Sequence, residues 1–281
     1  MVGRQEVGIF DPFDLHSAAM HEVEHTVSAH NTDTASSNRI HDDATARRFG
    51  FRGGLVPGVD VYAYLVHLPA ARWGREWLTG GSLVARFEQP VYDGDAVQVV
   101  WAPTGDLELR DPAGQRCAVA TPARQATRGS IYDFPLVASV AREDRPPASP
   151  ETLAVGTLFA LEPHRFDADV AQAYLDDVRE DLALFRVEGI AHPAWLLRDA
   201  NYVLSANVEL GPWIHVESEV VHHGLVTDGA VVSARARVER LFEKKGHRFV
   251  TLAVQHLADE RTVMTTWHTA IYRPRQVAEA G

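Results

Sequence analysis

Asn38 and His41 stand three residues apart on what the sequence predicts to be a short turn. Histidine exchanges a proton near neutral pH, so His41 could serve as an acid or a base. A loop containing glycine and proline, Gly53–Gly58, comes next, and then an apolar run that predicts a buried helix. The free N–H groups at the start of such a helix can hold an oxyanion. The stretch therefore predicts an acid–base site at a helix N-terminus.

The composition is that of a folded protein. Its 281 residues suffice for one large domain or two of ordinary size, and a hydrophobic content of 46% supports a core. Charged residues make up 23%, close to the average for folded proteins, so most of the chain is expected to be ordered. The net charge is −11 without any long basic run, which argues against nucleic acid or an anionic membrane as the main partner.

Several common signals of cofactor sites and of export do not occur in the sequence. Cys117 is the single cysteine, so an intrachain disulfide and a cysteine-based metal site are excluded. No apolar stretch approaches the roughly 18–20 residues that span a bilayer. Met1–Phe13 lacks the apolar core of a signal peptide, and we expect a cytoplasmic protein. No Walker or Rossmann glycine pattern and no Gly-x-Ser-x-Gly motif occurs, so neither a nucleotide cofactor nor a serine triad is indicated.

The hydrophobic pattern predicts a strand, a long helix and a meander of strands, and then a similar order again. The predicted helices are Asp42–Phe49, Val59–Leu78 with a kink or break at Pro69, Val170–Leu184, and one within Gly189–Val208. The predicted strands are His21–Ala29, Leu83–Phe87, Val91–Trp101, Leu107–Arg110, Arg116–Thr121, Gly156–Leu161, Trp213–Val226, Ala230–Leu241, Arg248–Leu257 and Thr262–Tyr272. Turns are predicted at Asp93-Gly94, Thr104-Gly105 and Ala113-Gly114.

The two halves of the chain align at a single offset of 135 residues. The matched pairs are Gly54-Leu55 with Gly189-Ile190 at a helix start, Asp93-Gly94 with Asp228-Gly229 at a hairpin turn, and Val23 with Leu158 in a first strand. Because these landmarks share one offset, we predict a duplicated unit, each half a sheet around one long helix. The alternative is two unrelated α+β domains. The predicted limits are 1–135 for the first unit, 136–151 for a linker that contains the Pro-rich Arg145–Pro150, and 152–281 for the second unit.

Three groups of residues in the first half resemble the motifs of a known family. They are Asn38-x-Ile40-His41 followed by Asp42, Asp43, Ala46, Phe49 and Gly50; Gly54-Leu55-Val56-Pro57-Gly58; and Arg86-Phe87-x-x-Pro90-Val91-x-x-Gly94-Asp95-x-Val97. In this order they are similar to the MaoC-like family of R-specific enoyl-CoA hydratases and 3-hydroxyacyl-thioester dehydratases, over roughly residues 20–122. The second half resembles that family in architecture only. The resemblance implies a double hotdog fold of class α+β, with a degenerate second unit.

The resemblance also implies roles for four residues of the motif. His41 matches the catalytic histidine, Asn38 matches the asparagine that helps to hold the site, and Gly58 matches the helix start whose N–H polarises the thioester carbonyl. The position of the family's catalytic aspartate, five residues before the histidine, is Ser36 in this chain, and Arg39 replaces the usual proline. Serine is no carboxylate base near neutral pH, so either His41 serves alone as base, with Ser36 and Asn38 fixing the water, or another carboxylate replaces the missing one.

The implied function is hydration or dehydration of an acyl thioester, carried by CoA or by an acyl-carrier protein, in fatty acid or polyketide metabolism. No cofactor and no metal is expected. The residues expected to bind substrate are Arg39, Val56, Pro57, Trp213 and His215. The chain is expected to be a monomer, with its two halves forming an internal pseudo-dimer, or a homodimer.

Alternatives remain open at several of these positions. The missing carboxylate could come from Asp33, Asp42 or Asp43 nearby, or from Glu217 in the other half. His41 could merely bind a backbone carbonyl, Ser36 could cap a turn, and Gly58 could only allow close packing. Histidines in the second half, among them His222-His223, lack the short spacing of a metal site. The rival functions are a thioesterase on the same fold and a non-catalytic acyl-thioester-binding protein.

Overall fold

The computed structural model describes residues 23–34, 37–127 and 133–275, and their strands form one ten-stranded antiparallel sheet. The first half supplies β1 (Glu24–Ser28), the 3-10 helix η1 (Arg39–His41), α1 (Asp43–Arg48), α2 (Gly58–Gly80), β2 (Ser82–Phe87), β3 (Ala96–Trp101), β4 (Leu107–Arg110) and β5 (Arg116–Ala123). The second half supplies η2 (Arg142–Asp144), β6 (Leu158–Arg165), α3 (Ala168–Asp177), α4 (Ala183–Glu188), α5 (Pro193–Ser205), β7 (Ile214–His222), β8 (Val231–Lys244), β9 (His247–Ala258) and β10 (Arg261–Arg273).

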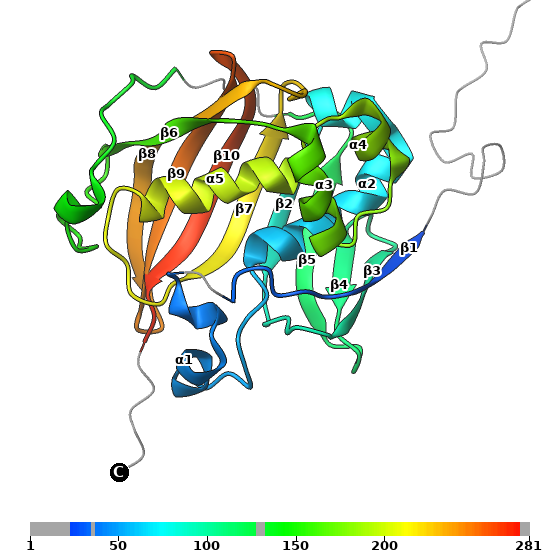
Figure 1. Ribbon diagram of the computed structural model, residues 1–281. Helices are drawn as coiled ribbons and strands as arrows, with labels where there is room; N and C mark the ends of the chain where they lie inside the picture. Colours follow the sequence, from blue (N-terminus) through cyan, green and yellow to red (C-terminus); the bar gives the residue numbers. More distant parts are fainter. Residues whose placement is uncertain (1–22, 35–36, 128–132, 276–281) are drawn as a thin grey trace, which may run out of the picture.

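The sheets of the two halves join edge to edge into one layer. The strand order is β1-β3-β4-β5-β2-β7-β10-β9-β8-β6, so β1 to β5 form one side and β6 to β10 the other. The joint is the antiparallel pair β2–β7, which runs from Ser82 opposite Val221 to Arg86 opposite Glu217. Helices α2 to α5 lie together on one face of this sheet (Figure 1). Because β2 and β7 pair with each other, neither strand leaves an exposed edge at the centre of the sheet. Exposed strand edges can pair with other chains and cause aggregation.

Helix α2 is the central helix of the first half, and its N-terminal half is buried on all sides. Every residue from Val59 to Ala70 is buried, which is typical of a helix enclosed by a sheet and neighbouring helices. The predicted break at Pro69 is wrong, because helical geometry continues through this residue. The interruption lies at Gly74, whose φ of 54° and ψ of −142° are non-helical and suit glycine. Tertiary packing around Pro69 outweighs the backbone hydrogen bond that proline cannot make.

The predicted repeat is confirmed by contacts that recur at the same offset. Helices α2 and α5 begin at Gly58 and Pro193, which are 135 residues apart. An isolated bridge joins Leu55 to Tyr92 in the first half, and the bridge from Ile190 to Thr227 repeats it in the second half at that offset. In each half, therefore, an isolated β-bridge is formed just before the main helix begins. The helix of the second half is shorter, because α5 ends at Ser205.

Three predicted elements differ from the structure. The strand Val91–Trp101 begins only at Ala96, and Asp93-Gly94 is no hairpin turn, since β2 and β3 do not pair with each other. Instead Gly94 N–H donates to the Ala29 carbonyl, at the end of β1. The helix Val170–Leu184 is split into α3 and α4, because Arg179 between them has a left-handed φ of 56°. The turns at Thr104-Gly105 and Ala113-Gly114 are confirmed as links between paired strands.

The Pro-rich linker is attached to the second half by a short parallel contact. Glu209 N–H donates to the Pro146 carbonyl, and Ala148 N–H donates to the Glu209 carbonyl. The limits predicted for the two units and the linker stay a prediction. Within the described ranges, no helix combines the length and apolar character needed to cross a membrane.

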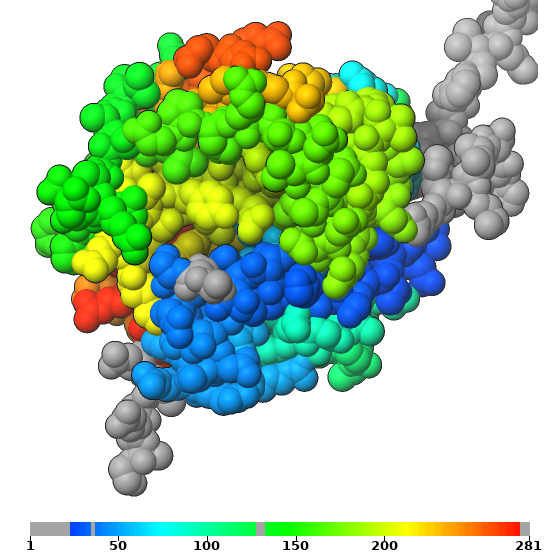
Figure 2. Space-filling view, in the orientation of Figure 1, coloured from blue at the N-terminus to red at the C-terminus, as the bar shows by residue number. Residues whose placement is uncertain are grey.

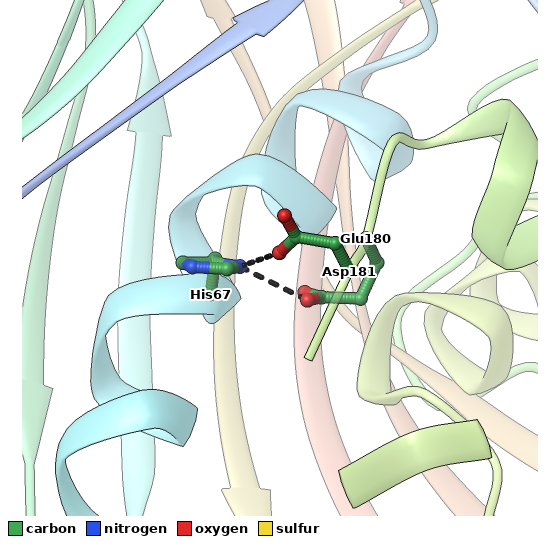
Figure 3. A group of neighbouring side chains, drawn as sticks. All are labelled: His67, Glu180 and Asp181. Atoms are coloured by element: carbon green, nitrogen blue, oxygen red, sulfur yellow. Dashed lines mark hydrogen bonds and ion pairs between the residues drawn. The ribbon is translucent and has the colours of Figure 1, made fainter. Parts of the chain in front are cut away.

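A buried ion pair connects the helix of the first half to the second half. The Glu180 carboxylate accepts from His67 Nδ1 of α2 at 2.9 Å, and its other oxygen lies 3.5 Å from His192 Nε2. Figure 3 shows Glu180 and Asp181 on the segment before α4, both pointing toward His67. Glu180 and both histidines are at most 3% exposed, whereas the side chain of Asp181 is 84% exposed. Despite its burial, hydrogen bonds and positive charge from His192 and His67 lower the pKa of Glu180 well below its usual range.

We predict that Glu180→Gln lowers the free energy of unfolding by about 3–5 kcal/mol, because it leaves buried histidines without their anionic partner. The depressed pKa means that this stabilisation is complete above the pKa of an unfolded glutamate and is lost as the pH falls below it. Urea unfolding at neutral and at acidic pH measures both effects. Asp181→Asn is the matched control, since that exposed neighbour contributes little. Equal stability of the two variants would contradict the prediction.

Candidate active site

A cavity of about 260 Å³ lies at the N-terminus of α2, between the two halves. Its walls are mostly apolar and come from both halves, with Ile40, Phe51, Leu55, Val56, Val61, Phe87 and Val91 from the first and Trp213, Ile214, Val216 and Ile271 from the second. Asn38, His41 and Asn201 form a polar end, which borders a second cleft, and His215, Glu88, Gln89 and His247 also line the cavity. An apolar pocket with a few convergent polar groups is the usual form of a small-molecule site.

A smaller cleft of about 90 Å³ adjoins this polar end. The two spaces share five lining residues, Asn38, His41, Pro57, Asn201 and Trp213, so these residues form the wall between them. Asp33, Arg198 and Tyr202 line the cleft but not the cavity. Figure 2 shows a hollow where the blue N-terminal segment meets the yellow part of the second half. The cleft thus offers water a route to one side of His41, with the apolar cavity on the other.

The amide of Asn38 fixes its loop to the backbone of the second half. Asn38 Nδ2 donates to the Trp213 carbonyl at 3.0 Å, and Trp213 N–H donates to Asn38 Oδ1 at 3.1 Å. Because a carbonyl only accepts and an N–H only donates, this pair determines which way the amide faces. The second hydrogen of Nδ2 therefore points to His41 Nε2, which is 3.3 Å away.

His41 is held as a neutral imidazole with a defined tautomer. Its Nδ1 lies 2.7 Å from the Leu55 carbonyl, an acceptor, so Nδ1 carries the proton. Its Nε2 then has a free electron pair, which faces the amide of Asn38. Burial lowers the pKa of His41, while the Leu55 hydrogen bond and the charge of Asp33 oppose this shift. At neutral pH the ring is consequently a base at Nε2. The alternative role of His41, binding a backbone carbonyl, is present at the same time.

A carboxylate does stand beside His41, although it comes from an earlier position than the motif predicts. Asp33 Oδ2 lies 3.8 Å from His41 Nε2, and the side chain of Asp33 is 33% exposed. Both atoms are acceptors, so they cannot bond to each other without a proton between them. They can, however, bind the two hydrogens of one water molecule. By distance and by its position in the shared cleft, Asp33 is the candidate among the four carboxylates for the role that the sequence left open.

A buried aspartate supports the loop that carries Asp33. Thr32 Oγ1 donates to Asp60 Oδ2 at 2.6 Å, and Asp60, in the first turn of α2, is fully buried. Burial raises the pKa of Asp60 to about 6, against the opposing charge of Arg198 and the hydrogen bond from Thr32. Asp60 therefore positions the neighbour of Asp33 from inside the protein.

Gly58 faces the ring of His215, and the two are too close for any side chain between them. A Cβ atom at residue 58 would lie 2.7 Å from His215 Nδ1. Within the described ranges helix α2 has no side-chain cap, and Asp60 N–H donates to the Pro57 carbonyl, so the N–H groups of Gly58 and Val59 are the ones available to a ligand. Both predicted readings of Gly58, close packing and an oxyanion role, are thus compatible with this geometry.

His215 continues into a chain of buried polar groups behind the cavity. Its Nε2 lies 2.8 Å from Ser218 Oγ, which in turn lies 3.1 Å from His268 Nδ1. Burial and the adjacent His268 lower the pKa of His215 well below the usual histidine range, so the ring is neutral. A neutral histidine fixed by a serine can orient a polar group of a ligand without bringing charge into an apolar cavity.

The other predicted site residues have mixed outcomes. Val56, Pro57 and Trp213 line the cavity. Arg39 lines neither space and pairs with Asp42 at 3.3 Å, so its expected substrate contact stays a prediction. Ser36 lies outside the described residues.

Of the alternative carboxylates, three have structural partners away from the cavity. Asp42 caps α1 by accepting from Thr45 N–H at 3.0 Å. Asp43 accepts from Gly54 N–H, and Glu217 pairs with Arg86 at 2.7 Å across the β2–β7 joint. Only Asp33 among the four candidates lines either space.

Three further residues of the site come from α5 and were not expected. Arg198 and Tyr202 line the cleft, and Asn201 lines both spaces. Among the described residues, the buried Oδ1 atom of Asn201 has no hydrogen-bond partner, so it can accept from a ligand. Their only sequence signal is polarity on one face of an otherwise apolar helix. Among the described residues, the one close group of three metal-binding side chains is His67, Glu180 and Asp181, outside this site.

The fold is shared with structures of known proteins, although no family model and no curated sequence matches the chain. A MaoC domain protein dehydratase from Chloroflexus aurantiacus J-10-fl superposes with a TM-score of 0.57 at 10% identity, over 89% of this chain and 94% of the other. A MaoC-like dehydratase superposes at 0.55 with 14% identity, over 90% and 98%. A Mycobacterium tuberculosis protein with a double hotdog fold superposes at 0.55 with 12% identity, over 89% and 96%. The chain is therefore an α+β double hotdog, as the resemblance implied.

We predict that Asp60→Asn changes the pH dependence of stability. A carboxyl whose pKa is raised to about 6 stabilises the fold while it is protonated, and this contribution is lost as the pH rises through 6. Asparagine cannot ionise and still accepts from Thr32. From pH 4.5 to 7.5, the free energy of unfolding of the wild type should therefore fall by about 2 kcal/mol relative to that of the variant. Urea unfolding across this range tests it, and parallel curves for the two proteins would show that Asp60 has an ordinary pKa.

Proposed function

We propose that the protein is an acyl-thioester hydratase or dehydratase that interconverts 2-enoyl and 3-hydroxyacyl thioesters. The observation that supports it most is the basic Nε2 of His41 beside Asp33 Oδ2, at the polar end of an apolar cavity. An apolar cavity suits an acyl chain, and a water-accessible base at its end suits chemistry near the thioester.

In the hydration direction, one water molecule takes the place of the 3.3 Å Asn38 contact at His41 Nε2 and is held between His41 and Asp33. His41 Nε2 takes a proton from this water as its oxygen attacks Cβ of the enoyl group, and the C=C electrons move onto the thioester as an enolate. The imidazolium then gives that proton to Cα, which completes the addition of water. Asp33 stabilises the imidazolium by its charge, and the Leu55 carbonyl keeps hold of Nδ1 throughout.

The enolate oxygen forms at the N-terminus of α2. The Gly58 N–H donates to it, assisted by the positive end of the helix dipole. The same contact polarises the thioester carbonyl before attack. His215, which adjoins Gly58, limits where the thioester can lie.

The proposal predicts that His41→Ala lowers kcat/KM for hydration of a trans-2-enoyl-CoA by about 10²–10⁴-fold, because it removes the acid–base group. Asp33→Asn should lower it by about tenfold or more, chiefly through kcat, because charge support of the imidazolium is lost. The loss of absorbance of the conjugated thioester measures the rate.

Asp42→Asn is the matched control, because asparagine also caps α1 and Asp42 lies next to His41 outside the site. It should hydrate at the wild-type rate. Release of free CoA instead, with the same dependence on Asp33, would favour the thioesterase. Thioester binding without any turnover would favour the non-catalytic binding protein.

A further inference from the structure

An open groove of about 770 Å³ lies beside the acyl cavity, at one end of β8, β9 and β10. Four stretches of chain line both spaces with adjacent or nearly adjacent residues. In the groove these are Phe49, Pro212, Gly246 and Tyr272, and in the cavity they are Phe51, Trp213, His247 and Ile271. The groove therefore begins where the acyl cavity ends.

Cations concentrate at this end of the sheet, although the chain carries a net charge of −11. The turn between β8 and β9 contains Lys244 and Lys245, and Arg248 follows it. Arg273 and Arg275 come from the end of β10 and the segment beyond it. Three of these five, all arginines, line the groove, together with the carboxylates of Glu209 and Glu243.

Two of the arginines are cross-strand neighbours. Arg248 and Arg273 are directly opposite on β9 and β10, an arrangement in which like charges repel. Glu243 lies 3.9 Å from Arg248 and balances that charge in part. Within the described ranges, neither Arg273 nor Arg275 forms an ion pair. The repulsion is relieved if an anionic ligand binds here.

The segment that carries Arg275 is fixed next to the groove. Arg275 N–H donates to His247 Nδ1 at 3.0 Å, and the side chain of Arg275 lies over Gly246. The pKa of His247 is lowered, first by burial and then by the positive charges of Arg275 and Lys245. The positive field of the cluster therefore reaches a residue of the acyl cavity.

We infer that this groove binds the 3′-phosphorylated ADP end of coenzyme A, with Arg248, Arg273 and Arg275 contacting its phosphates. Guanidinium groups form charge-assisted, bidentate hydrogen bonds to phosphate. The pantetheine arm would pass between the groove and the cavity at Pro212–Trp213. The inference rests on the proposed function, because it identifies the carrier of the acyl thioester.

The shape of the groove favours a nucleotide over the surface of a carrier protein. Its volume falls in the range of small-molecule sites. Phe49, Leu210, Pro212 and Tyr272 give it apolar surface, on which an adenine ring can stack or pack. A carrier protein would present acidic helices to a broad basic face, whereas the arginines here line a hollow.

Binding of adenosine 3′,5′-bisphosphate and of CoA to the full-length protein, measured by calorimetry, tests the inference without any turnover. Arg273→Gln and Arg275→Gln should each weaken both ligands by roughly tenfold, and added salt should weaken binding to the wild type. Arg261→Gln is the matched control, since Arg261 is exposed and lies at the opposite end of β10. It should bind as the wild type does.

Kinetics with a CoA thioester and with the corresponding pantetheine thioester separate this inference from the proposed function. The two variants should raise KM for the CoA thioester alone and leave kcat unchanged. No binding of the bisphosphate, or equal affinity in variants and wild type, would overturn the CoA site even if hydration occurs. The inference would also be overturned if the variants weakened the binding of an acyl-carrier protein but not that of CoA. Binding that depends on these arginines in a protein without hydratase activity would support the site and contradict the reaction.

Discussion

The amide of Asn38 binds the backbone of Trp213 with both its oxygen and its nitrogen, and the geometry of the site depends on this contact. One hydrogen remains on the amide nitrogen, and it determines where His41 Nε2 accepts. The Leu55 carbonyl accepts from the other ring nitrogen, Nδ1, which therefore carries the proton. A loop of the first half thus gets its chemical orientation from the second half. The Leu55 carbonyl sets the tautomer of the histidine, so no carboxylate is needed for that purpose.

This dependence explains why a degenerate second half is retained. The second half has Asp176 where the repeat would place a histidine, so it offers no second site of the same kind. It does supply the Trp213 backbone, the His215 ring against Gly58, and polar residues of α5 along the cleft. The Glu180 ion pair and the β2–β7 joint hold these parts in register. The cavity therefore has walls from both halves.

The sequence predicted most of the fold, and part of the site, for local reasons. The strands follow the alternation of apolar residues, and the helix starts at Gly58 and Pro193 follow from the repeat. Pro69 misled the prediction because burial of α2 outweighs a local penalty. Asn38 and His41 are close in sequence and could be found from their spacing. Asn201 could not, because only tertiary packing brings α5 to the cavity.

The position of Asp33 shows why a motif with a missing residue need not mean a missing function. Proton transfer requires two acceptors that converge on one point, and it places no condition on their separation along the chain. A loop of eight residues can bring its end next to His41 if something holds it there. Thr32 bound to the buried Asp60 does so, and it ties that loop to the first turn of α2. The first turn of α2 therefore positions Asp33 and carries Gly58, whereas His41 is held by Asn38 and the Leu55 carbonyl.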